Sequence, residues 1–116
     1  MPVQIDKPLV WLGDSRNSVR GFHVVARQRS GFELRRVQEG KDPSDWKPMQ
    51  DVGPGVREIR IRTGEQFRIM YVAQFSEAVY VLHAFEKKSQ QTARHDIDLA
   101  KVRYRTLVAQ RKRIHK

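Results

Sequence analysis

Residues 78–98 read AVYVLHAFEKKSQQTARHDID, an apolar run that ends in two lysines and leads into polar sequence. The segment from Val79 to Phe85 is almost uninterrupted in apolar side chains and is rich in β-branched and aromatic ones. This composition predicts a strand that is covered on both faces, in the middle of a sheet. Lys87 and Lys88 follow where the strand leaves the core, so a rigid element should hold two cations at the rim of the sheet. Cations placed in this way indicate an anionic partner.

The polar residues after the lysines predict a connection and then a C-terminal helix over residues 93–110. Thr92 is suited to the N-cap position, and Asp96 lies near the positive end of the helix dipole. Apolar residues recur at helical spacing and should be buried: Ile97, Ala100, Tyr104, Leu107 and Val108. The basic residues between them should be exposed: Lys101, Arg103 and Arg105. Residues 111–116 read RKRIHK and are expected to form a frayed basic tail.

The first forty residues predict one short strand and two helices. Pro8 opens the apolar run at 8–12, which favours an edge strand because proline cannot donate a hydrogen bond to a neighbouring strand. A helix should begin near Arg16, and a break near Gly21 should divide it from a second helix that ends at Gly40. The apolar residues of this helical pair recur on one side: Val19, Phe22, Val25, Ala26, Phe32, Leu34 and Val37.

Two clear strands follow the loop-like segment 41–55, which is rich in proline, glycine and aspartate. Residues 56–62 place apolar side chains on one face and charged ones on the other, where Glu58, Arg60 and Arg62 alternate with Ile59 and Ile61. Gly64 marks a turn and residues 66–74 return, which predicts an antiparallel hairpin. A second tight connection then leads into the apolar strand described first. The sequence also allows a further short edge strand at 46–49.

These elements predict an α+β domain over residues 1–110. We expect a small twisted antiparallel sheet of about four strands, with an N-terminal helical pair and a C-terminal helix packed on one face. A chain of 116 residues is long enough for one such core. It has no cysteine, which excludes disulfides and thiolate metal sites. It also has no apolar run of about 20 residues and no signal-peptide pattern, so we expect a soluble, cytoplasmic protein without a membrane partner.

Charge is distributed unevenly along the chain. The formal net charge is +10, from 23 Lys and Arg against 13 Asp and Glu. Residues 87–116 hold ten basic and two acidic residues, which places +8 of the +10 in the last thirty positions. Such asymmetry indicates nucleic acid, an anionic membrane surface or an acidic protein as the partner. The alternative is a solvated helix face with a basic end that binds nothing in particular.

Four cations should meet on adjacent strands. Arg60 and Arg68 lie close together in any tight pairing of the hairpin, and Lys87 and Lys88 arrive on the third strand. Together they would form a concave basic surface able to bind a phosphodiester chain. The alternative is that Arg60 forms an ordinary cross-strand ion pair with one of three carboxylates: Glu58, Glu65 or Glu86.

The histidines show no metal-binding pattern. His23, His83, His95 and His115 are not spaced as HxH or HExxH, so we expect neither a metal site nor a cofactor. His83 lies within the apolar strand, where a hydrogen-bonded core or rim histidine is the simpler interpretation. The sequence also shows no Ser–His–Asp or Cys–His pattern of the kind used in nucleophilic catalysis. Any catalysis must therefore rely on Arg, Lys, His, Tyr or a carboxylate.

Several segments occur together in an order that is specific to one group of proteins. The segments are WKPM (46–49), VGPGVREIRI (52–61), FRIMYVA (67–73), YVLHAFEKKSQQT (80–92) and the helix DIDLAKVRYRTL (96–107). They resemble the phage-protein-like HigB branch of the RelE/ParE superfamily, the toxins of type II toxin–antitoxin systems. The departures are Ser89, where threonine is commoner in that branch, and Ala93, where a proline commonly follows the threonine.

The resemblance implies a fold and an activity. The fold is a small sheet with helices on one side and an RNA-facing cleft on the other. The activity is cleavage of messenger RNA, usually on the translating ribosome, which would inhibit translation and growth. A cognate antitoxin would restrain it, and we expect a helix-turn-helix protein encoded next to the toxin. Fold alone does not fix the activity, because ParE-like relatives act on DNA gyrase. A non-catalytic nucleic-acid-binding module is a third interpretation.

RNA cleavage without a metal has defined chemical needs. The 2′-hydroxyl attacks the adjacent phosphorus, and the protein must stabilise charge on the phosphorane oxygens and move protons at the 2′-oxygen and at the leaving oxygen. Arg60 and Arg68 suit the first task, because a guanidinium matches phosphate with two parallel hydrogen bonds. Lys87 or Lys88 could stabilise charge or transfer a proton. The weaker candidates for proton transfer are His83 and Tyr71, and the further candidates for RNA contact are Arg57, Arg62, Arg94 and Lys101.

Overall fold

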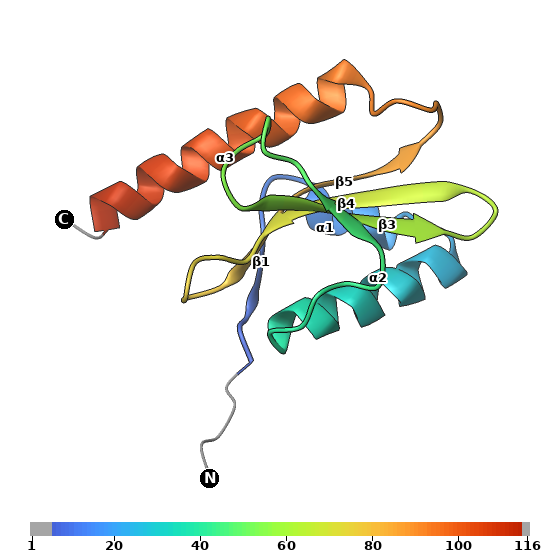
Figure 1. The fold of residues 1–116 in the computed structure, drawn as a ribbon, viewed down its shortest axis with the longest axis horizontal. Coiled ribbons are helices and arrows are strands. Elements are labelled where there is room, and N and C mark those ends of the chain that lie inside the picture. Colours follow the sequence, from blue (N-terminus) through green and yellow to red (C-terminus); the bar gives the residue numbers. More distant parts are fainter. Residues whose placement is uncertain (1–5, 115–116) are drawn as a thin grey trace, which may run out of the picture.

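The computed structural model describes residues 6–114, and its central element is a twisted five-stranded sheet with helices on both faces (Figure 1). The strands are β1 (Leu9–Trp11), β2 (Trp46–Pro48), β3 (Val56–Arg62), β4 (Gln66–Val72) and β5 (Val79–Lys87). The helices are α1 (Ser15–Arg20), α2 (Val24–Gln38) and α3 (Arg94–Ile114). The order across the sheet is β1-β5-β4-β3-β2, so β4 is central and the two shortest strands form the edges. The α+β prediction is confirmed.

The three long strands form the antiparallel meander that the sequence predicts. Ile59 and Ile61 of β3 are buried on one face, and Gly64 takes φ +101° in the β3–β4 turn, a conformation that favours glycine. Strand β5 pairs with β4 on one side and β1 on the other. Its residues contribute to the cores on both faces of the sheet, as the apolar run from Val79 predicts.

The sheet is mixed rather than wholly antiparallel, and it has five strands. Strand β1 runs parallel to β5, with Leu9 opposite Val79 and Trp11 opposite Val81. The parallel direction is possible because about seventy residues separate the two strands, ample for a crossover, whereas hairpin-connected neighbours must be antiparallel. The optional strand at 46–49 exists as β2, and it pairs antiparallel with β3.

A bulge interrupts the β4–β5 ladder at Leu82. Met70 lies opposite His83 and Tyr71 lies opposite Val81, which leaves Leu82 as the extra residue. A bulge changes the side-chain alternation of a strand locally. As a result Val81 and Ala84 belong to one core, while Leu82 belongs to the other and His83 bonds to a residue of α3.

The N-terminal helical pair covers one face of the sheet. Helix α1 ends at Gly21, and His23 caps α2 by accepting a hydrogen bond from the Ala26 N–H. Helix α2 continues through Gly31, where a Cβ would meet no atom of the described residues within 4 Å. The core on this face contains Val19, Phe22, Ala26, Leu34 and Val37. The prediction that Val25 and Phe32 join it is wrong, because Phe32 is 60% exposed and Val25 also faces outward.

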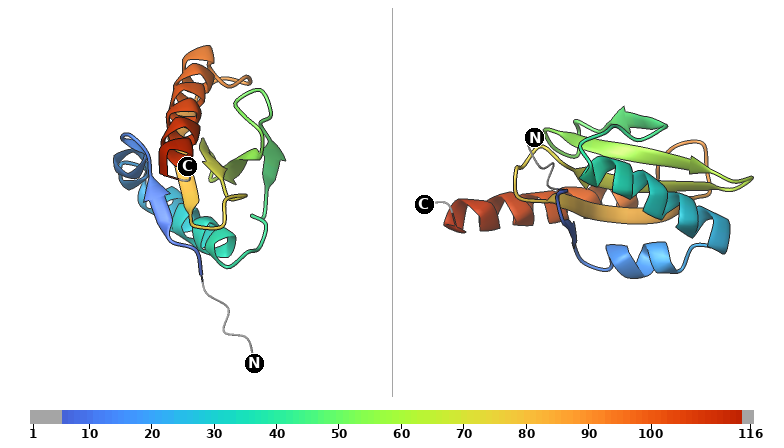
Figure 2. Two further views of the ribbon diagram at one scale, coloured as in Figure 1. Left: turned by 90° about the vertical axis from the view of Figure 1, so that its left-hand side faces the viewer. Right: turned by 90° about the horizontal axis from the view of Figure 1, so that it is seen from below.

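Helix α3 packs on the opposite face, so the helices do not share one side (Figure 2). Ala100 and Leu107 are buried there against Val56, Met70, Val72 and Leu82. The burial stripe is the predicted one, but the side of the sheet differs from the prediction. A stripe of apolar residues specifies which face of the helix is buried and carries no information about which face of the sheet it covers.

The C-terminal end of α3 is ordered further than predicted. The helix continues to Ile114, past the predicted end at Gln110, while His115 and Lys116 of the predicted tail lie outside the described residues. Arg111 explains this extension. Its guanidinium stacks 3.8 Å from the centre of the Phe75 ring and bonds to both carboxylate oxygens of Glu77, at 2.6 and 3.1 Å. Two contacts on the β4–β5 connection thus hold the last helical turns against the sheet.

Candidate nucleic-acid interface

Five basic side chains gather on the part of the sheet that lies beside α3. They project from the same face because their positions alternate with residues buried under α2, such as Ile59 and Ile61. Arg60 and Arg68 are direct partners in the β3–β4 ladder, as the hairpin predicts. We call this set the cationic face, and its members are Lys47, Arg60, Arg62, Arg68 and Lys87.

A buried carboxylate forms the floor of the cationic face. Glu58 is fully buried, and its Oε1 lies 3.5 Å from Arg68 Nε and 3.8 Å from Lys47 Nζ. Arg68 is also buried, and it donates hydrogen bonds to the Gln66 side chain at 2.8 Å and to the Phe67 carbonyl. Within residues 6–114, neither oxygen of Glu58 accepts a hydrogen bond of good geometry. Glu58 is therefore held by charge attraction, beneath cations that outnumber it.

The environment of the cationic face alters the acidity of two members. Burial lowers the pKa of Arg68, and repulsion from Arg60 and Arg62 acts in the same direction against attraction from Glu58. Burial also lowers the pKa of Lys87, assisted by Arg68, Lys47 and Arg60, while Glu58 opposes the shift. A lysine whose charged form is disfavoured gives up its proton more readily than a free lysine does.

Lys87 lies where two open cavities meet. One, of about 430 Å³, lies between β2 and the start of α3 and is lined by Lys47, Pro48, Met49, Lys87, Gln91 and Ile97, among others. The second, of about 540 Å³, lies beside the β3–β4 turn and is lined by Gly64, Gln66, Lys87 and Lys88, among others. Lys88 is exposed just beyond the end of β5, so the structure places the two lysines in different surroundings. Only Lys87 belongs to the cationic face.

Carboxylates at the rim partly balance the outer arginines. Asp45 lies 3.8 Å from Arg60 and 3.8 Å from Arg62. Arg60 therefore does have an ion-pair partner, but the partner is Asp45 and none of the three glutamates considered from the sequence. At 3.8 Å and with more than a quarter of the Arg60 side chain exposed, this pair is weak. Both arginines can exchange it for a phosphate.

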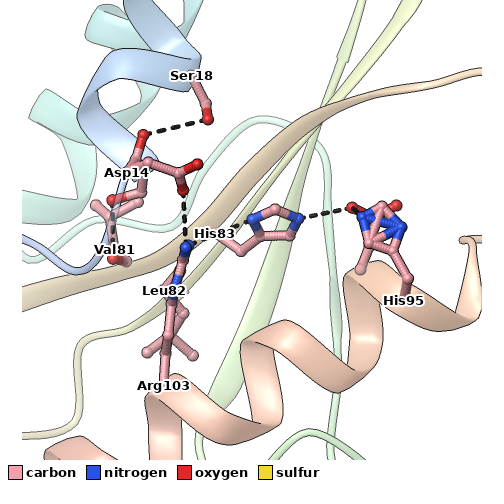
Figure 3. A network of polar contacts seen from close by, with 9 residues as sticks. Asp14, Ser18, Val81, Leu82, His83, His95 and Arg103 are labelled. Carbon is pink, nitrogen blue, oxygen red and sulfur yellow. Dashed lines mark hydrogen bonds and ion pairs between the residues drawn. The ribbon is translucent and has the colours of Figure 1, made fainter.

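His83 belongs to a separate network that joins α3 to β5 and to the start of α1 (Figure 3). Its Nε2 lies 2.6 Å from Asp96 Oδ1, and its Nδ1 faces Arg103 Nη1 at 3.5 Å. Arg103 has only donors, so Nδ1 accepts and the ring proton is on Nε2, donated to Asp96. Arg103 also donates to the Leu82 carbonyl at 2.9 Å and to Asp14 at 2.7 Å. Because both of its ring nitrogens are engaged, His83 connects β5 to α3.

The sequence did not predict that Arg103 takes part in this network, because the helical pattern predicts that its side chain is exposed. Gly13 explains how the arginine fits: its φ is +54°, and a Cβ there would lie 2.5 Å from the guanidinium. The backbone before α1 thus passes directly against Arg103. The positively charged neighbour lowers the pKa of Asp14, mainly through their hydrogen bond. No local sequence signal marks this contact, since 89 residues separate the partners.

Tyr71 and Arg57 lie on the other face of the sheet, under the C-terminal end of α2. Each directly follows or precedes a residue whose side chain is on the α3 face. Because successive side chains of a strand point to opposite faces, Tyr71 and Arg57 point to the α2 face. Tyr71 is therefore separated from Arg68 by the sheet itself, so the structure does not bring these two candidates together. Arg57 likewise lies on the face opposite Arg62, and its contact with RNA stays a prediction.

The remaining RNA-contact candidates are on α3. Arg94 is exposed and donates to Asp98 of the same helix at 3.2 Å, an ordinary surface pair. Lys101 is half-buried two turns further along. Neither is among the charges that act on Arg68 or Lys87. The sequence analysis did not place Lys47 and Glu58 together in the site. The antiparallel pairing of β2 with β3, in which these two residues are ladder partners, is the signal that could have identified them.

Comparison with known proteins identifies the chain's family. A family model described as "Phage derived protein Gp49-like (DUF891)" matches residues 17–105. The match covers well over half of the chain, from α1 through most of α3, and includes every member of the cationic face. No curated protein matches the chain at a significant level. Because the family model covers most of the fold and the whole candidate site, the chain belongs to the Gp49-like family of phage-derived proteins, a toxin-like family of the RelE/ParE type.

Proposed function

We propose that this protein is the toxin of a type II toxin–antitoxin system, of the HigB branch, and that it cleaves messenger RNA on the translating ribosome. Family membership supports the toxin part of the proposal. One observation supports the ribonuclease part: two ladder-paired arginines and a lysine of lowered pKa share one open face of the sheet. The cognate antitoxin would keep the activity in check until it is degraded or displaced.

The cationic face has groups for each requirement of the reaction. The 2′-oxygen forms a bond to phosphorus, the P–O5′ bond breaks, and the products are a 2′,3′-cyclic phosphate and a 5′-hydroxyl. Arg60 exchanges Asp45 for the scissile phosphate and stabilises its extra charge in the transition state. Arg68 is fixed in direction by Gln66 and Glu58, so it supports that charge without reorganising.

Lys87 is the group of this face best suited to proton transfer. Its lowered pKa brings its ionisation closer to the working pH, which favours both release and recapture of a proton. In this proposal Lys87 protonates the 5′-oxygen as it leaves, and ribosomal RNA or water accepts the proton of the 2′-hydroxyl. The protein contributes one side chain to the proton transfers and relies on the ribosome to align the attacking group.

The direct test is to incubate purified protein with translating ribosomes and to map RNA ends that carry a 5′-hydroxyl. We expect new 5′-hydroxyl ends with the natural protein, and a loss of at least about a hundredfold in single-turnover rate with Lys87→Met. Lys88→Met is the matched control, because it removes the same charge from the adjacent exposed position. Equal losses in the two variants would show that only net charge matters and would remove Lys87 from the mechanism.

Growth provides a second test. Expression of the chain without an antitoxin should arrest growth and reduce protein synthesis rapidly. Arrest without RNA cleavage, together with inhibition of DNA gyrase supercoiling, would replace the ribonuclease proposal by the ParE-like alternative. Normal growth with verified soluble protein would exclude both toxin functions and leave a nucleic-acid-binding module. A small adjacent gene for a helix-turn-helix protein would identify the antitoxin.

A further inference from the structure

A further polar cavity lies on the α2 face of the sheet, away from the cationic face. It has a volume of about 390 Å³ and lies between the C-terminal end of α2, strands β3 and β4, and the segment before β1. Its polar lining comes from Lys7, Lys41, Asp42, Arg57, Tyr71 and Gln74. The sheet separates it from Arg68 and Lys87, so the proposed ribonuclease chemistry does not use it.

Arg57 is held firmly at the wall of this cavity. Its Nη1 donates to Asp42 Oδ1 at 2.8 Å, and its guanidinium stacks 3.9 Å from the centre of the Trp46 ring. Burial opposes the charge of Arg57, but the hydrogen bonds that Arg57 donates to Asp42 and Tyr71 outweigh it and raise the pKa, so the guanidinium stays charged. Two anchors fix the position of this cation before any ligand arrives, and its remaining N–H groups can face the cavity.

Tyr71 lines the same cavity and has a buried hydroxyl. The side chain is 1% exposed, and among residues 6–114 no acceptor takes the proton of this hydroxyl. Burial raises the pKa of Tyr71, while a hydrogen bond donated by Arg57 and the charge of Arg57 lower it by less, so the O–H remains protonated. A buried donor without an acceptor is unfavourable in proteins generally, and such groups commonly mark a site for water or a ligand.

Charge and hydrogen-bonding capacity define what the cavity can accept. Three cations line it, Lys7, Lys41 and Arg57, against the single carboxylate of Asp42. Its side-chain donors also outnumber its acceptors, and Lys7 donates to the Ala73 carbonyl at the cavity wall. The volume is near the lower end of the range of about 300–1,000 Å³ typical of small-molecule sites. We propose that this cavity binds a small organic anion whose carboxylate or phosphate pairs with Arg57 and accepts a hydrogen bond from the Tyr71 hydroxyl.

The test uses inorganic phosphate and acetate as separate probes of the two anion types. Each is titrated into the full-length protein while the Arg57 Nε–Hε signal is followed by NMR. We expect a saturable shift with at least one probe, and an affinity about tenfold weaker or worse in Arg57→Gln. Arg105→Gln is the matched control, because it removes the same charge from an exposed position on α3 and should leave the affinity within about twofold. Binding of one probe alone identifies the group that the cavity recognises.

Tyr71→Phe tests the hydroxyl independently of any activity. Without an anion, we expect this variant to unfold at the same temperature as the natural protein or a higher one, because it removes an unpartnered O–H. With the bound probe, its gain in unfolding temperature should be smaller. A variant that is less stable than the natural protein without an anion would show that the hydroxyl is already satisfied, which overturns the proposal. So would the lack of a saturable shift with either probe up to about 50 mM, where a millimolar site is filled.

Discussion

Glu58 and Arg68 form a 3.5 Å ion pair in which the two side chains are only 1% and 3% exposed. A buried pair of this kind contributes little net stability, but removing one partner leaves an uncompensated charge in the core. The pair therefore determines how the cationic face responds to mutation. It also means that a loss of activity at Arg68 must be separated from a loss of folding.

The first prediction is that Arg68→Ala lowers the free energy of unfolding by about 3–5 kcal/mol, because buried Glu58 is left with only the partly exposed Lys47 as an ion-pair partner. The double variant Glu58→Gln/Arg68→Met should recover most of that loss, since neither charge remains. Urea unfolding of the two variants measures the difference. If Arg68→Ala is as stable as the natural protein, the pair is solvated in solution and Arg68 can be assigned to catalysis from activity alone.

The second prediction concerns Lys87, for which stability and activity should change in opposite directions. Its pKa is lowered in the folded protein, so folding opposes its charge at every pH below that lowered value, and the penalty fades as the pH rises towards 10.5, the ordinary lysine value. Lys87→Met should therefore raise the unfolding midpoint at pH 7 while it reduces cleavage. Lys88→Met should change neither strongly. A lower midpoint for Lys87→Met would mean that its charge stabilises the fold.

The third prediction tests the role of Glu58 at the cationic face. Glu58 is the one carboxylate among the strongest influences on Lys87, and it opposes the lowering of the lysine pKa. Glu58→Gln should therefore lower the pKa of Lys87 further and shift the pH dependence of cleavage to lower pH. NMR titration of the Lys87 side chain measures the first effect without any substrate. An unchanged titration would show that Glu58 and Lys87 do not interact.

The fourth prediction concerns pH and the C-terminal end of α3. Hydrogen bonding to Arg111 lowers the pKa of Glu77 from 4.5 to about 2. A lowered carboxylate pKa gives stability that is complete above pH 4.5 and is lost as the pH falls towards 2. The stability difference between the natural protein and Glu77→Gln should thus be constant at neutral pH and shrink between pH 4.5 and 2. Thermal unfolding across this range measures it, and added salt should reduce the difference at every pH.

Two truncated chains that differ by one residue test the contacts of Arg111 with Phe75 and Glu77. A chain that ends at Arg111 keeps the guanidinium on Phe75 and Glu77, whereas a chain that ends at Gln110 loses it. The shorter chain should unfold at a lower temperature, although it differs by one residue. Of the basic residues predicted to lie in a frayed tail, Lys112 and Arg113 are exposed, whereas Arg111 makes the contacts described above.

The fifth prediction concerns His83. Because its two ring nitrogens are engaged by Asp96 and Arg103, His83→Gln should lower the free energy of unfolding by about 1–3 kcal/mol. It should leave single-turnover cleavage by the folded protein, and the pH dependence of that cleavage, close to those of the natural protein. If the cleavage rate of this variant no longer falls on one side of the pH optimum, His83 transfers a proton in the reaction.

Much of the fold follows from local pattern. The alternation around Ile59 and Ile61, the glycine at position 64 and the apolar run from Val79 each have a period or a turn signal that fixes structure within a few residues. The direction of β1 and the side of the sheet that α3 covers depend on contacts between distant segments. A three-residue strand and a regular helical stripe are compatible with either arrangement, so the sequence pattern could not decide between them.

The candidate site was predictable in the same partial way. The pairing of Arg60 with Arg68 follows from the hairpin, and so does their common face. Tyr71 lies on the face opposite Arg68, because three positions along a strand reverse the side-chain direction. His83 faces α3 because of the bulge at Leu82, and nothing in the local sequence marks a bulge there.

The parallel pairing of β1 with β5 has a consequence for how the protein is made. Leu9 to Trp11 are synthesised some seventy residues before their partners, Val79 to Val81. Until then the first strand has no neighbour, and the sheet lacks both β5 and Lys87. A nascent chain therefore cannot assemble the cationic face until β5 has been synthesised.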